Sequence, residues 1–531
     1  MKKALKNLLC ITLCMACLLA SGCSAVSNET PGFSLPQGDV TSPPPDEISS
    51  EEITTLADIP IEVPDISAND YSAVYQAELG NLTSKMEIGT TREGYTGDGY
   101  VTGFARNSEE HWSMDIEITS SQHYDISLFV SSDSPKNNRL YIDGEFVGEI
   151  ITKGSDGFEK VTLENVFLPQ GVCRFEIIEV TAAIAFDKIE IDANLSSTTL
   201  TFEATATPIN ENANEKTKNT LKYLTDIYGE KLLSGQFASI GANVEPEKLH
   251  ILTGRYPALR LGDMYSYTIE ADPSVIGDTT IAKQWSDMGG IVSYMWHWAA
   301  PMHGLSCYSD VTGFDLALAM TDKDIATKSF DELQVMFTNG EISEECLALI
   351  HDIDIISKEF SYLQDENVTI LWRPLHEASG GWFWWGSAGK DAYLWLWDLM
   401  YERMTCHHNL NNLLWIWNAQ SESWYVGDDK CDIISVDIYK DGDFSSQLST
   451  FISLQGISQN KLIALSECSN PVLPELSVRD RAMWAWFCVW GGSYIMDEAG
   501  ELTDAYTTPE QWIDIYSSQA VITLEELPDL S

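Results

Sequence analysis

Two kinds of hydrophobic pattern divide the chain. Between about residues 69 and 194, short runs alternate polar and apolar positions and are separated by turns of Gly, Asn and Asp. This period of two is typical of half-buried antiparallel strands. After about residue 205, longer apolar runs alternate with amphipathic stretches such as DAYLWLWDLMYERM (391–404). The first region therefore predicts an antiparallel β-sandwich, and the second predicts alternating strands and helices.

The second region contains eight strand candidates, each largely apolar and then polar or aromatic at its end. They are residues 231–238, 256–264, 290–298, 368–377, 412–419, 432–439, 462–469 and 485–492. Eight such units in a region of about 320 residues predict a (β/α)8 TIM barrel. In that fold the chemistry lies at the C-terminal ends of the strands.

The N-terminal segment predicts export. Residues 1–22 run from a basic start through an apolar stretch too short to be read as a membrane span. They end before Cys23 in LASGC, which resembles a bacterial lipobox and implies lipidation of Cys23. A soluble secreted protein with an incidental Cys is the alternative. We expect an extracellular protein, lipid-anchored to the membrane at the bacterial cell surface.

The boundaries follow from changes in composition. Residues 1–22 are the expected signal peptide, 23–68 the lipidated Cys and a disordered Pro/Ser/Glu linker, 69–195 the sandwich and 205–525 the barrel. The 531 residues exceed the roughly 100–200 of one domain, so two folded domains are expected.

Composition narrows the class of partner. The formal charge of −49 disfavours nucleic acid and anionic membrane surfaces, so a neutral polysaccharide fits better. The 17 Trp are concentrated in the C-terminal half, and we expect more of them than a core needs, with flat faces available to sugar rings. The seven Cys after residue 23 form no CxxC pair, so neither a zinc site nor a disulfide framework is implied.

The sandwich region carries a first resemblance. YQAELG (75–80), GYTGDGYV (94–101), HYDISLFV and LYIDG together resemble carbohydrate-binding module family 35 and its relatives. The resemblance implies a structural Ca²⁺ near the sandwich termini, for which Gln76, Glu78 and Asp192 are the candidates by position. Solvated polar residues on edge strands are the alternative. Loop 181–186, TAAIAF, lacks the stacking Trp expected of such modules, so no sugar ligand is assigned.

The most informative segment is LWRPLHEASGGWFWWG (371–386). An apolar strand there delivers Arg373, His376 and Glu377 at its end, followed by a Gly turn and four aromatic residues. Hydrogen bonds can orient such a Glu, and aromatic neighbours that restrict water raise its pKa towards the range of a general acid. A structural ion pair between Glu377 and Arg373 is the alternative.

A second strand, in KLIALSECSN (461–470), ends in the single carboxylate Glu467. Glu377 and Glu467 are 90 residues apart, about three βα units, which places them on the fourth and seventh strands. Those strand ends can face each other across the barrel mouth. A retaining glycosidase needs two carboxyls about 5–5.5 Å apart, one to protonate the leaving oxygen and one to attack the anomeric carbon.

RPLHE, GGWFWWG, VDIYKD, ALSECS and CVWGG, in that order, resemble glycoside hydrolase family 26. The resemblance covers about residues 205–525 and implies a TIM barrel with Glu377 as acid/base and Glu467 as nucleophile. It further implies a set of substrate-site roles. His376 positions the carboxylates, Trp382 lines the cleavage point, Tyr439 hydrogen-bonds the nucleophile, Trp490 forms the platform of the −1 subsite, and His297 and Trp298 line the glycone side; Arg373 belongs to the same set.

The expected function is therefore that of a retaining endo-β-1,4-mannanase acting on mannan, glucomannan or galactomannan. Within the same family, β-1,3-xylanase and mixed-linkage β-glucanase activities are alternatives, and a catalytically silent glycan-binding surface lipoprotein is an alternative of another class. No cofactor is expected for catalysis. The expected partner is a neutral β-mannan, with no nucleic acid and a membrane reached only through the lipid anchor, and the chain is expected to act as a monomer.

Overall fold

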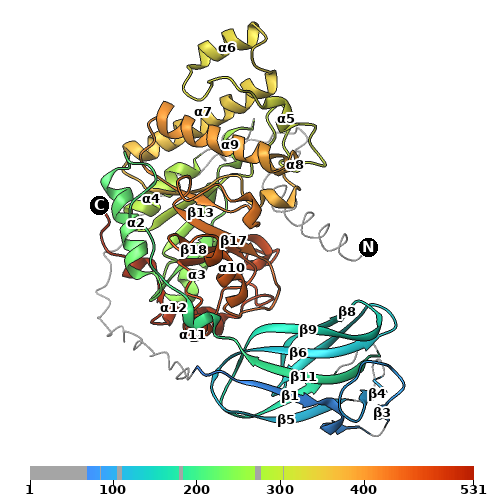
Figure 1. The fold of residues 1–531 in the computed structure, drawn as a ribbon. Coiled ribbons are helices and arrows are strands. Elements are labelled where there is room, and N and C mark those ends of the chain that lie inside the picture. The colour runs from blue at the N-terminus through green and yellow to red at the C-terminus, as the bar shows by residue number, and fades with distance from the viewer. Residues whose placement is uncertain (1–67, 84, 105–110, 179–182, 270–276, 303) are drawn as a thin grey trace, which may run out of the picture.

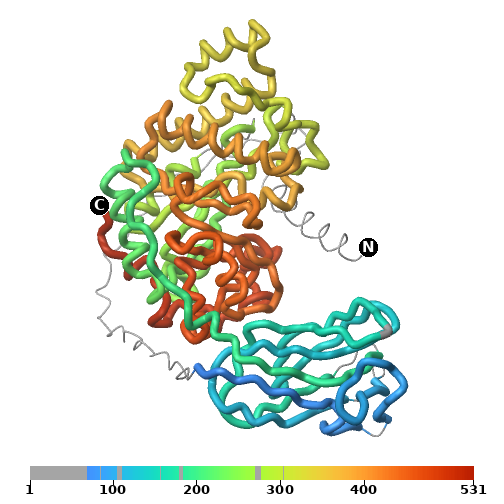
Figure 2. The backbone as a smooth tube through the Cα atoms, in the orientation of Figure 1, coloured from blue at the N-terminus to red at the C-terminus, as the bar shows by residue number. Residues whose placement is uncertain are grey.

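The computed structural model describes residues 68–83, 85–104, 111–178, 183–269, 277–302 and 304–531. The signal peptide, Cys23 and nearly all of the linker lie outside these residues, as do two residues of loop 181–186. Figures 1 and 2 show a sandwich at the N-terminal end and a larger barrel with surrounding helices. None of the helices in the described ranges is both long and apolar enough to cross a membrane.

The sandwich consists of two antiparallel sheets, as predicted. One has the order β3 (Glu87–Gly89), β4 (Tyr100–Thr102), β11 (Ala185–Ala193), β6 (Gln122–Ser132), β9 (Ser155–Leu168), with β1 (Ser72–Gln76) also on β11. The other has the order β2 (Asn81–Leu82), β5 (Trp112–Ile118), β10 (Gly171–Ile177), β7 (Lys136–Ile142), β8 (Glu145–Thr152).

Alternation of buried and exposed positions builds the sandwich core. Trp112 is fully buried, packs edge-on against Phe186 at 4.9 Å and donates from its indole to the carbonyl of Ala77 at 2.8 Å. Strands β7 and β8 form a hairpin. Asp143 and Gly144 between β7 and β8 both have positive φ, 54° and 85°, as tight hairpin turns require.

The barrel contains all eight predicted strands. They are β12 (Leu232–Phe237), β13 (Leu259–Asp263), β14 (Ile291–Met295), β15 (Ile370–Arg373), β16 (Leu413–Trp417), β17 (Ile433–Ile438), β18 (Leu462–Cys468) and β19 (Trp486–Val489). They pair in parallel in chain order, and β12 closes the barrel by pairing with both β13 and β19. A two-residue strand, β20 (Val521–Ile522), adds to β12.

Helices surround the barrel strands (Figure 1). They are α2 (Glu215–Ile227), α3 (Val244–Thr253), α4 (Asp278–Asp287), α7 (Glu344–Asp365), α9 (Lys390–Glu402), α10 (Leu448–Ile457), α11 (Pro474–Asp480) and α12 (Pro509–Ser517). Between β14 and β15 an insertion adds the shorter α5 (Leu316–Ala319) and α6 (Phe330–Thr338), and α8 (Trp384–Ser387) follows β15. In Figure 1, α6 projects from the end of the barrel farthest from the sandwich.

Most of the Trp residues belong to the core, which corrects the expectation that they exceed its needs. Twelve of them are less than 2% exposed: Trp112, Trp285, Trp296, Trp298, Trp372, Trp384, Trp385, Trp397, Trp415, Trp417, Trp484 and Trp486. Their indole area is buried between strands and helices, where it contributes to the hydrophobic free energy of folding. Only a few indoles, Trp382 and Trp490 among them, remain partly exposed.

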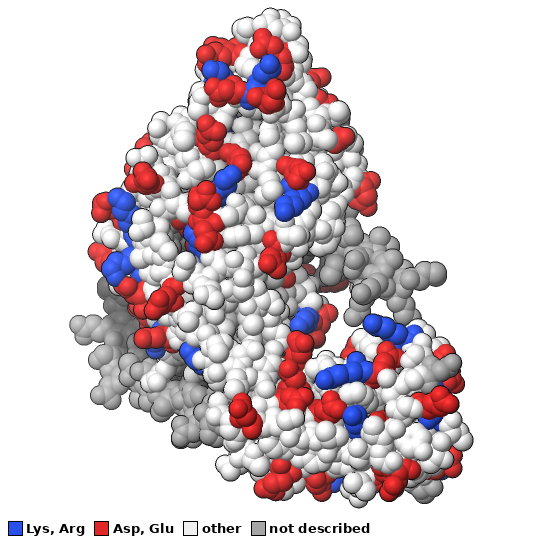
Figure 3. All heavy atoms as spheres, viewed as in Figure 1, with Lys and Arg blue, Asp and Glu red and all other residues white. Residues whose placement is uncertain are grey.

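The sandwich packs directly on the barrel. The buried imidazole of His123, on β6, bonds to Asp480 of α11 at 2.9 Å, and Asn165 donates to Ser449 of α10 at 2.9 Å. The guanidinium of Arg479 lies over the ring of Phe167 at 4.3 Å. Acidic side chains are spread over both domains on the face shown in Figure 3, rather than gathered in one patch.

Candidate active site

Three carboxyl groups meet at the C-terminal end of the barrel. One oxygen from each of Glu377, Asp437 and Glu467 lies within 4.8 Å of the others. Asp437 and Glu467 are the penultimate residues of β17 and β18, and Glu377 lies on the loop after β15. The sequence therefore predicted correctly that Glu377 and Glu467 meet across the barrel mouth. Asp437, which also converges there, was not predicted.

Glu467 is held by two donors. The Tyr439 hydroxyl donates to its Oε2 at 2.6 Å, as the family resemblance implied, and the Arg373 guanidinium donates to its Oε1. Arg373 also donates to Asp437 at 2.8 Å and is fully buried. Its ion pairs thus go to Asp437 and Glu467 rather than to Glu377, which was the alternative. Arg373 is buried beneath the carboxylates, and it was wrongly grouped with residues that contact substrate.

Glu377 does not lie on the strand itself. The strand predicted over 368–377 ends at Arg373, because Pro374 has no N–H to donate to the ladder. Leu375 and Glu377 then adopt positive φ angles of 52° and 53°, so the chain turns sharply. The backbone N–H of Glu377 donates to the carbonyl of Asn418 at 2.6 Å, and the Trp382 indole donates to its carboxyl at 3.1 Å.

The surroundings of Glu377 favour its protonated form. Burial, followed by the nearby charge of Glu467, raises the pKa of the Glu377 carboxyl to about 7. Arg373 and the Trp382 hydrogen bond act in the opposite direction but do not cancel these effects. A carboxyl that keeps its proton near neutral pH, beside a carboxylate held by Arg and Tyr, can act as acid and base in one reaction.

Of the aromatic side chains predicted to line the site, some are partly exposed and one belongs to the core. Trp382 is 39% exposed. Trp490 is partly exposed and stacks on Phe237 at 4.4 Å, and we expect both Trp382 and Trp490 to contact substrate. Trp298 does not line the cleft as predicted. It is fully buried, stacks on Trp296 at 3.9 Å and donates to Asp352 at 2.8 Å, so its indole is part of the core.

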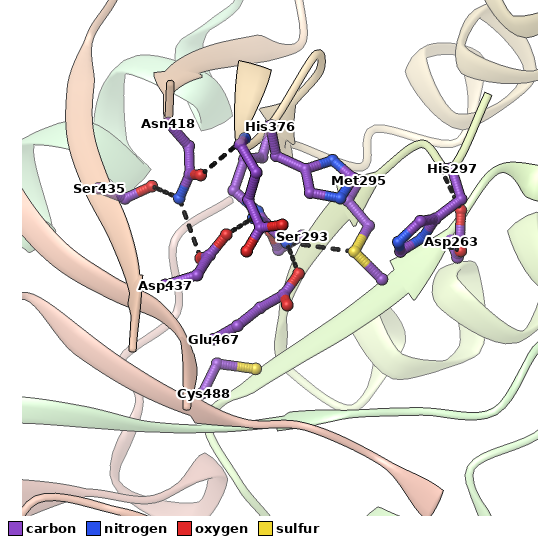
Figure 4. Close-up of polar contacts among 12 residues, drawn as sticks. Asp263, Ser293, Met295, His297, His376, Asn418, Ser435, Asp437, Glu467 and Cys488 are labelled. Carbon is purple, nitrogen blue, oxygen red and sulfur yellow. Dashed lines mark hydrogen bonds and ion pairs between the residues drawn. The ribbon is translucent and has the colours of Figure 1, made fainter. Parts of the chain in front are cut away.

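Two histidines lie beside the carboxyl cluster (Figure 4). His376 is 1% exposed, and burial, His297 and Arg373 hold its pKa well below the usual range, so the ring is neutral. It contacts His297 edge-on at 4.7 Å. Hydrogen bonds to the carboxyl cluster come from Arg373, Tyr439, Asn418 and Trp382, and His376 contributes none that the described contacts include.

Sequence reasoning missed four residues of the site: Asp437, Asn418, Asp263 and Phe237. Asp437 and Asp263 are charged residues at the ends of buried strands, which is a readable signal. Asn418 donates to both Ser435 and Asp437, at 2.9 and 3.0 Å, and lies directly after β16 (Figure 4). Phe237 ends β12, and nothing in its local sequence distinguishes it from a core residue.

The three carboxyls have the donor types of a metal site. Arg373, however, reaches two of them and already supplies a positive charge to the cluster. The donor set therefore fits acid–base chemistry around a guanidinium.

The calcium candidates are only partly brought together. Gln76 accepts a hydrogen bond from Thr96 at 3.0 Å, and Glu78 accepts one from the backbone N–H of Asp98 at 2.8 Å. Gly97 has a positive φ of 66°, which residues with a side chain rarely adopt, and a Cβ there would also lie within 2.9 Å of oxygens of both residues. The second oxygen of Glu78 is buried without a partner in the described structure.

Asp192 lies elsewhere. In the ladder between β1 and β11, Asp192 pairs with Ser72. Gln76 pairs with Lys188, four positions further along the same ladder. Its carboxylate accepts from the Ser72 hydroxyl at 2.6 Å. Asp187 instead reaches the turn that contains Gly97, accepting from the backbone of Thr96 at 2.7 Å. Strand register, which the sequence does not reveal, decides this difference.

Comparisons with known proteins identify the family to which the barrel belongs. Residues 209–508 match the family model described as Glycosyl hydrolase family 26. A mannan endo-1,4-beta-mannosidase of Thermothelomyces thermophilus is 32% identical over 471 residues, covering 86% of this chain and 90% of that protein.

Two solved structures are also similar. The GH26-CBM35 beta-(1,4)-mannanase of Podospora anserina is 30% identical with a TM-score of 0.60, covering 87% of this chain and all of that one. A beta-mannanase from a symbiotic protist of the termite Reticulitermes speratus, complexed with gluco-manno-oligosaccharide, is 29% identical with a TM-score of 0.54, covering 61% of this chain and 98% of that one.

Proposed function

The chain belongs to glycosyl hydrolase family 26, and from this premise we propose that it is an endo-β-1,4-mannanase that retains anomeric configuration. The observation that carries the mechanism is the pairing of Glu377, whose pKa is raised to about 7, with Glu467 at an oxygen separation within 4.8 Å. That spacing suits direct attack on the sugar and leaves little room for the water that an inverting enzyme places between its carboxyls.

The proposed reaction proceeds in two displacements. Glu377 donates its proton to the leaving glycosidic oxygen while a carboxylate oxygen of Glu467 bonds to the anomeric carbon. The ionised Glu377 then takes a proton from water, whose oxygen displaces Glu467 from that carbon. Arg373 donates to one oxygen of Glu467 and Tyr439 donates to the other, so the carboxylate has a fixed orientation before substrate binds. Such preorganisation lowers the cost of reaching the transition state.

Mannan is the proposed substrate because the similar proteins named above are β-mannanases, one of them solved with a gluco-manno-oligosaccharide. Reducing-end release from galactomannan, glucomannan, lichenan and β-1,3-xylan tests this proposal. We expect activity on the first two polymers. Activity confined to β-1,3-xylan or lichenan would favour the other activities of the family. Binding without release from any polymer would favour a silent glycan-binding protein.

The roles of the two glutamates predict different rescue behaviour. Glu377→Ala should lose roughly 10²–10⁴-fold in activity on mannan but much less on an activated aryl mannoside, whose leaving group needs no proton. Azide should then attack the accumulated glycosyl-enzyme and yield a β-mannosyl azide. Glu467→Ala should lose activity on both substrates, and any azide product from an activated β-mannoside should have inverted configuration.

Glu402→Ala is the matched control, because Glu402 is an exposed carboxylate at the end of α9, and this variant should act like the wild type. Retained aryl activity in Glu467→Ala together with its loss in Glu377→Ala would reverse the assignment. Near-normal mannan hydrolysis by both variants would discard the site.

The location and the accessory domain are further proposals. Lipidation of Cys23 should hold the enzyme at the cell surface, so Cys23→Ala should move it into the medium, and continued membrane association would contradict the anchor. For the sandwich we propose a family 35-like module that binds Ca²⁺ through Gln76 and Glu78. The unpartnered oxygen of Glu78 supports this, and Asp192 is too far along the ladder to contribute.

A further inference from the structure

Asp263, at the end of β13, is committed to three N–H groups. Its Oδ1 accepts from the backbone of Tyr265 and of His297, each at 3.0 Å, and its Oδ2 lies 2.8 Å from Nδ1 of His297. Asp263 is 2% exposed, so water offers it little further hydrogen bonding. Its two oxygens serve as the acceptors of these three contacts. Nδ1 of His297 therefore carries a proton.

The other ring nitrogen of His297 is free to face a ligand. Nε2 lies on the side of the ring away from Asp263, and among the described residues it has no hydrogen-bond partner, although it is not fully enclosed. The residue is 8% exposed. Its ring lies edge-on to Phe383 and Trp490, at 5.7 and 5.9 Å, so the small opening is at the wall that carries the expected sugar platform.

We propose that Asp263 is a positioning residue that keeps His297 in the doubly protonated form, so that Nε2–H donates a charged hydrogen bond to a hydroxyl of the sugar on the glycone side of the cleft. The proposal rests on the proposed function for its substrate. Figure 4 shows Asp263 beside His297, with Glu467 nearer the middle of the cluster. A charged donor binds a hydroxyl about twice as strongly as a neutral one.

The charged groups around His297 are consistent with this assignment. Burial disfavours the imidazolium, but the charge and hydrogen bond of Asp263, with help from Glu467, outweigh it and raise the pKa of His297. Arg373 acts against the imidazolium, and His376, which contacts the ring, is neutral. The charge of His297 in turn favours ionisation of Glu377. Asp263 is therefore the partner whose loss should change the proton on His297.

The test uses an activated aryl β-mannobioside, for which loss of the Glu377 proton does not limit cleavage. For the wild type we expect KM to rise roughly 5–10-fold from pH 6 to pH 9 as His297 loses its proton and Nε2 turns from donor to acceptor. In Asp263→Asn the two backbone N–H groups keep the amide oxygen, so the NH₂ faces Nδ1 and the ring proton moves to Nε2. This variant keeps a neutral donor, so its KM should be high and flat across the same pH range.

Two further variants separate charge from structure. His297→Gln places a neutral N–H near the Nε2 position and should also give a KM that is high and flat across this pH range. Asp331→Asn, at an exposed carboxylate of α6, should keep the pH dependence of the wild type. A wild-type KM that does not change with pH, or an Asp263→Asn variant that follows the wild-type curve, would overturn the proposal.

An activity-independent readout keeps this inference distinct from the proposed function. In protein labelled with [¹³Cε1]histidine, the NMR signal that His297→Gln removes should titrate above the ordinary value of about 6.5 in the wild type. The same signal should titrate at least one pH unit lower in Asp263→Asn. If the wild type cleaves no β-mannoside, the proposed function fails while this titration still decides the role of Asp263. A wild-type titration at or below the ordinary value would refute that role, even if Asp263→Asn does not fold.

Discussion

The mouth of the barrel and the Gly97 turn of the sandwich both gather carboxylate oxygens, yet they balance the charge differently. At the barrel mouth, Arg373 lies between Glu467 and Asp437 and bonds to each. At the turn, one oxygen of Glu78 is buried without a partner, and no basic side chain reaches it among the described contacts. A buried negative charge is tolerated only with a counter-charge or with hydrogen bonds. The barrel therefore carries its own cation, whereas the sandwich is expected to take one from solution.

The largest effect should come from removing the cation of the barrel. Arg373→Met leaves Asp437 and Glu467 buried without their shared partner, which should cost about 3–5 kcal/mol of unfolding free energy and abolish hydrolysis. Urea denaturation and a mannan assay measure the two losses. Arg373→Lys restores the charge but not the two-sided geometry, so it should recover more stability than activity. A methionine variant as stable as the wild type would show that the guanidinium does not balance this cluster.

A smaller effect should follow from removing the external cation of the sandwich. Ca²⁺ at about a hundredfold excess over its dissociation constant should stabilise the folded domain by about 2.7 kcal/mol, and EDTA should reverse this. Calorimetry with and without Ca²⁺ measures the shift in the sandwich transition. Glu78→Gln should remove the response, whereas Glu87→Gln, at an exposed glutamate of β3, should keep it. An unchanged transition in the wild type would contradict the calcium proposal.

The two regions also differ in what their sequence revealed. In a parallel barrel all strands end at the same rim, so locating Glu467 at the end of an apolar run was enough to place it opposite Glu377. In the sandwich, the partners of a residue depend on antiparallel register and bulges. Asp192, which the sequence grouped with Gln76 and Glu78, therefore lies at the other end of β11 from them, whereas Asp187 reaches their turn.

Local sequence was also silent about burial within the barrel. Trp298 and Trp490 both follow apolar strands, but the first is fully buried in the core and the second is partly exposed. The Asp263 pair with His297 joins the end of β13 to the segment after β14 and is visible only after folding.

The stability of the barrel mouth should depend on pH through Glu377. Its pKa is about 7 in the folded protein and about 4.3 in an unfolded chain, so the unfolded state ionises first as pH rises. The contribution of the Glu377 carboxyl to the unfolding free energy of the wild type is thus fully present below about pH 4 and is lost as pH rises to 7. Glu377→Gln stays neutral and should exceed the wild type by on the order of 1–3 kcal/mol at pH 8, with little difference at pH 4.

Urea midpoints of both proteins at the two pH values test this prediction. Equal midpoints at pH 8 would show that Glu377 ionises in the folded protein as easily as in the unfolded chain. The same variant should lose roughly 10²–10⁴-fold in mannan hydrolysis. A gain in stability together with this loss of activity would show that the burial of the Glu377 carboxyl serves the reaction.

An effect similar in size to that of Glu377 should come from the contact between the two regions. His123 bonds to Ser197 at 3.1 Å and to Asp480 at 2.9 Å, and Asp480 also accepts from Ser446 at 2.5 Å, so loss of the imidazole leaves buried acceptors short of a donor. His123→Ala should lower the unfolding free energy by roughly 1–3 kcal/mol, while His351→Ala, at an exposed ring, should change it little.

His123 and Arg479 hold the pKa of Asp480 below its usual range despite burial, so this contribution is present above about pH 4 and is lost at lower pH. Hydrolysis of short soluble manno-oligosaccharides should be unchanged, because the acid, the nucleophile and their hydrogen-bond partners all belong to the barrel. If His123→Ala lowers this activity together with the unfolding free energy, the sandwich and the active site do not act as separate regions.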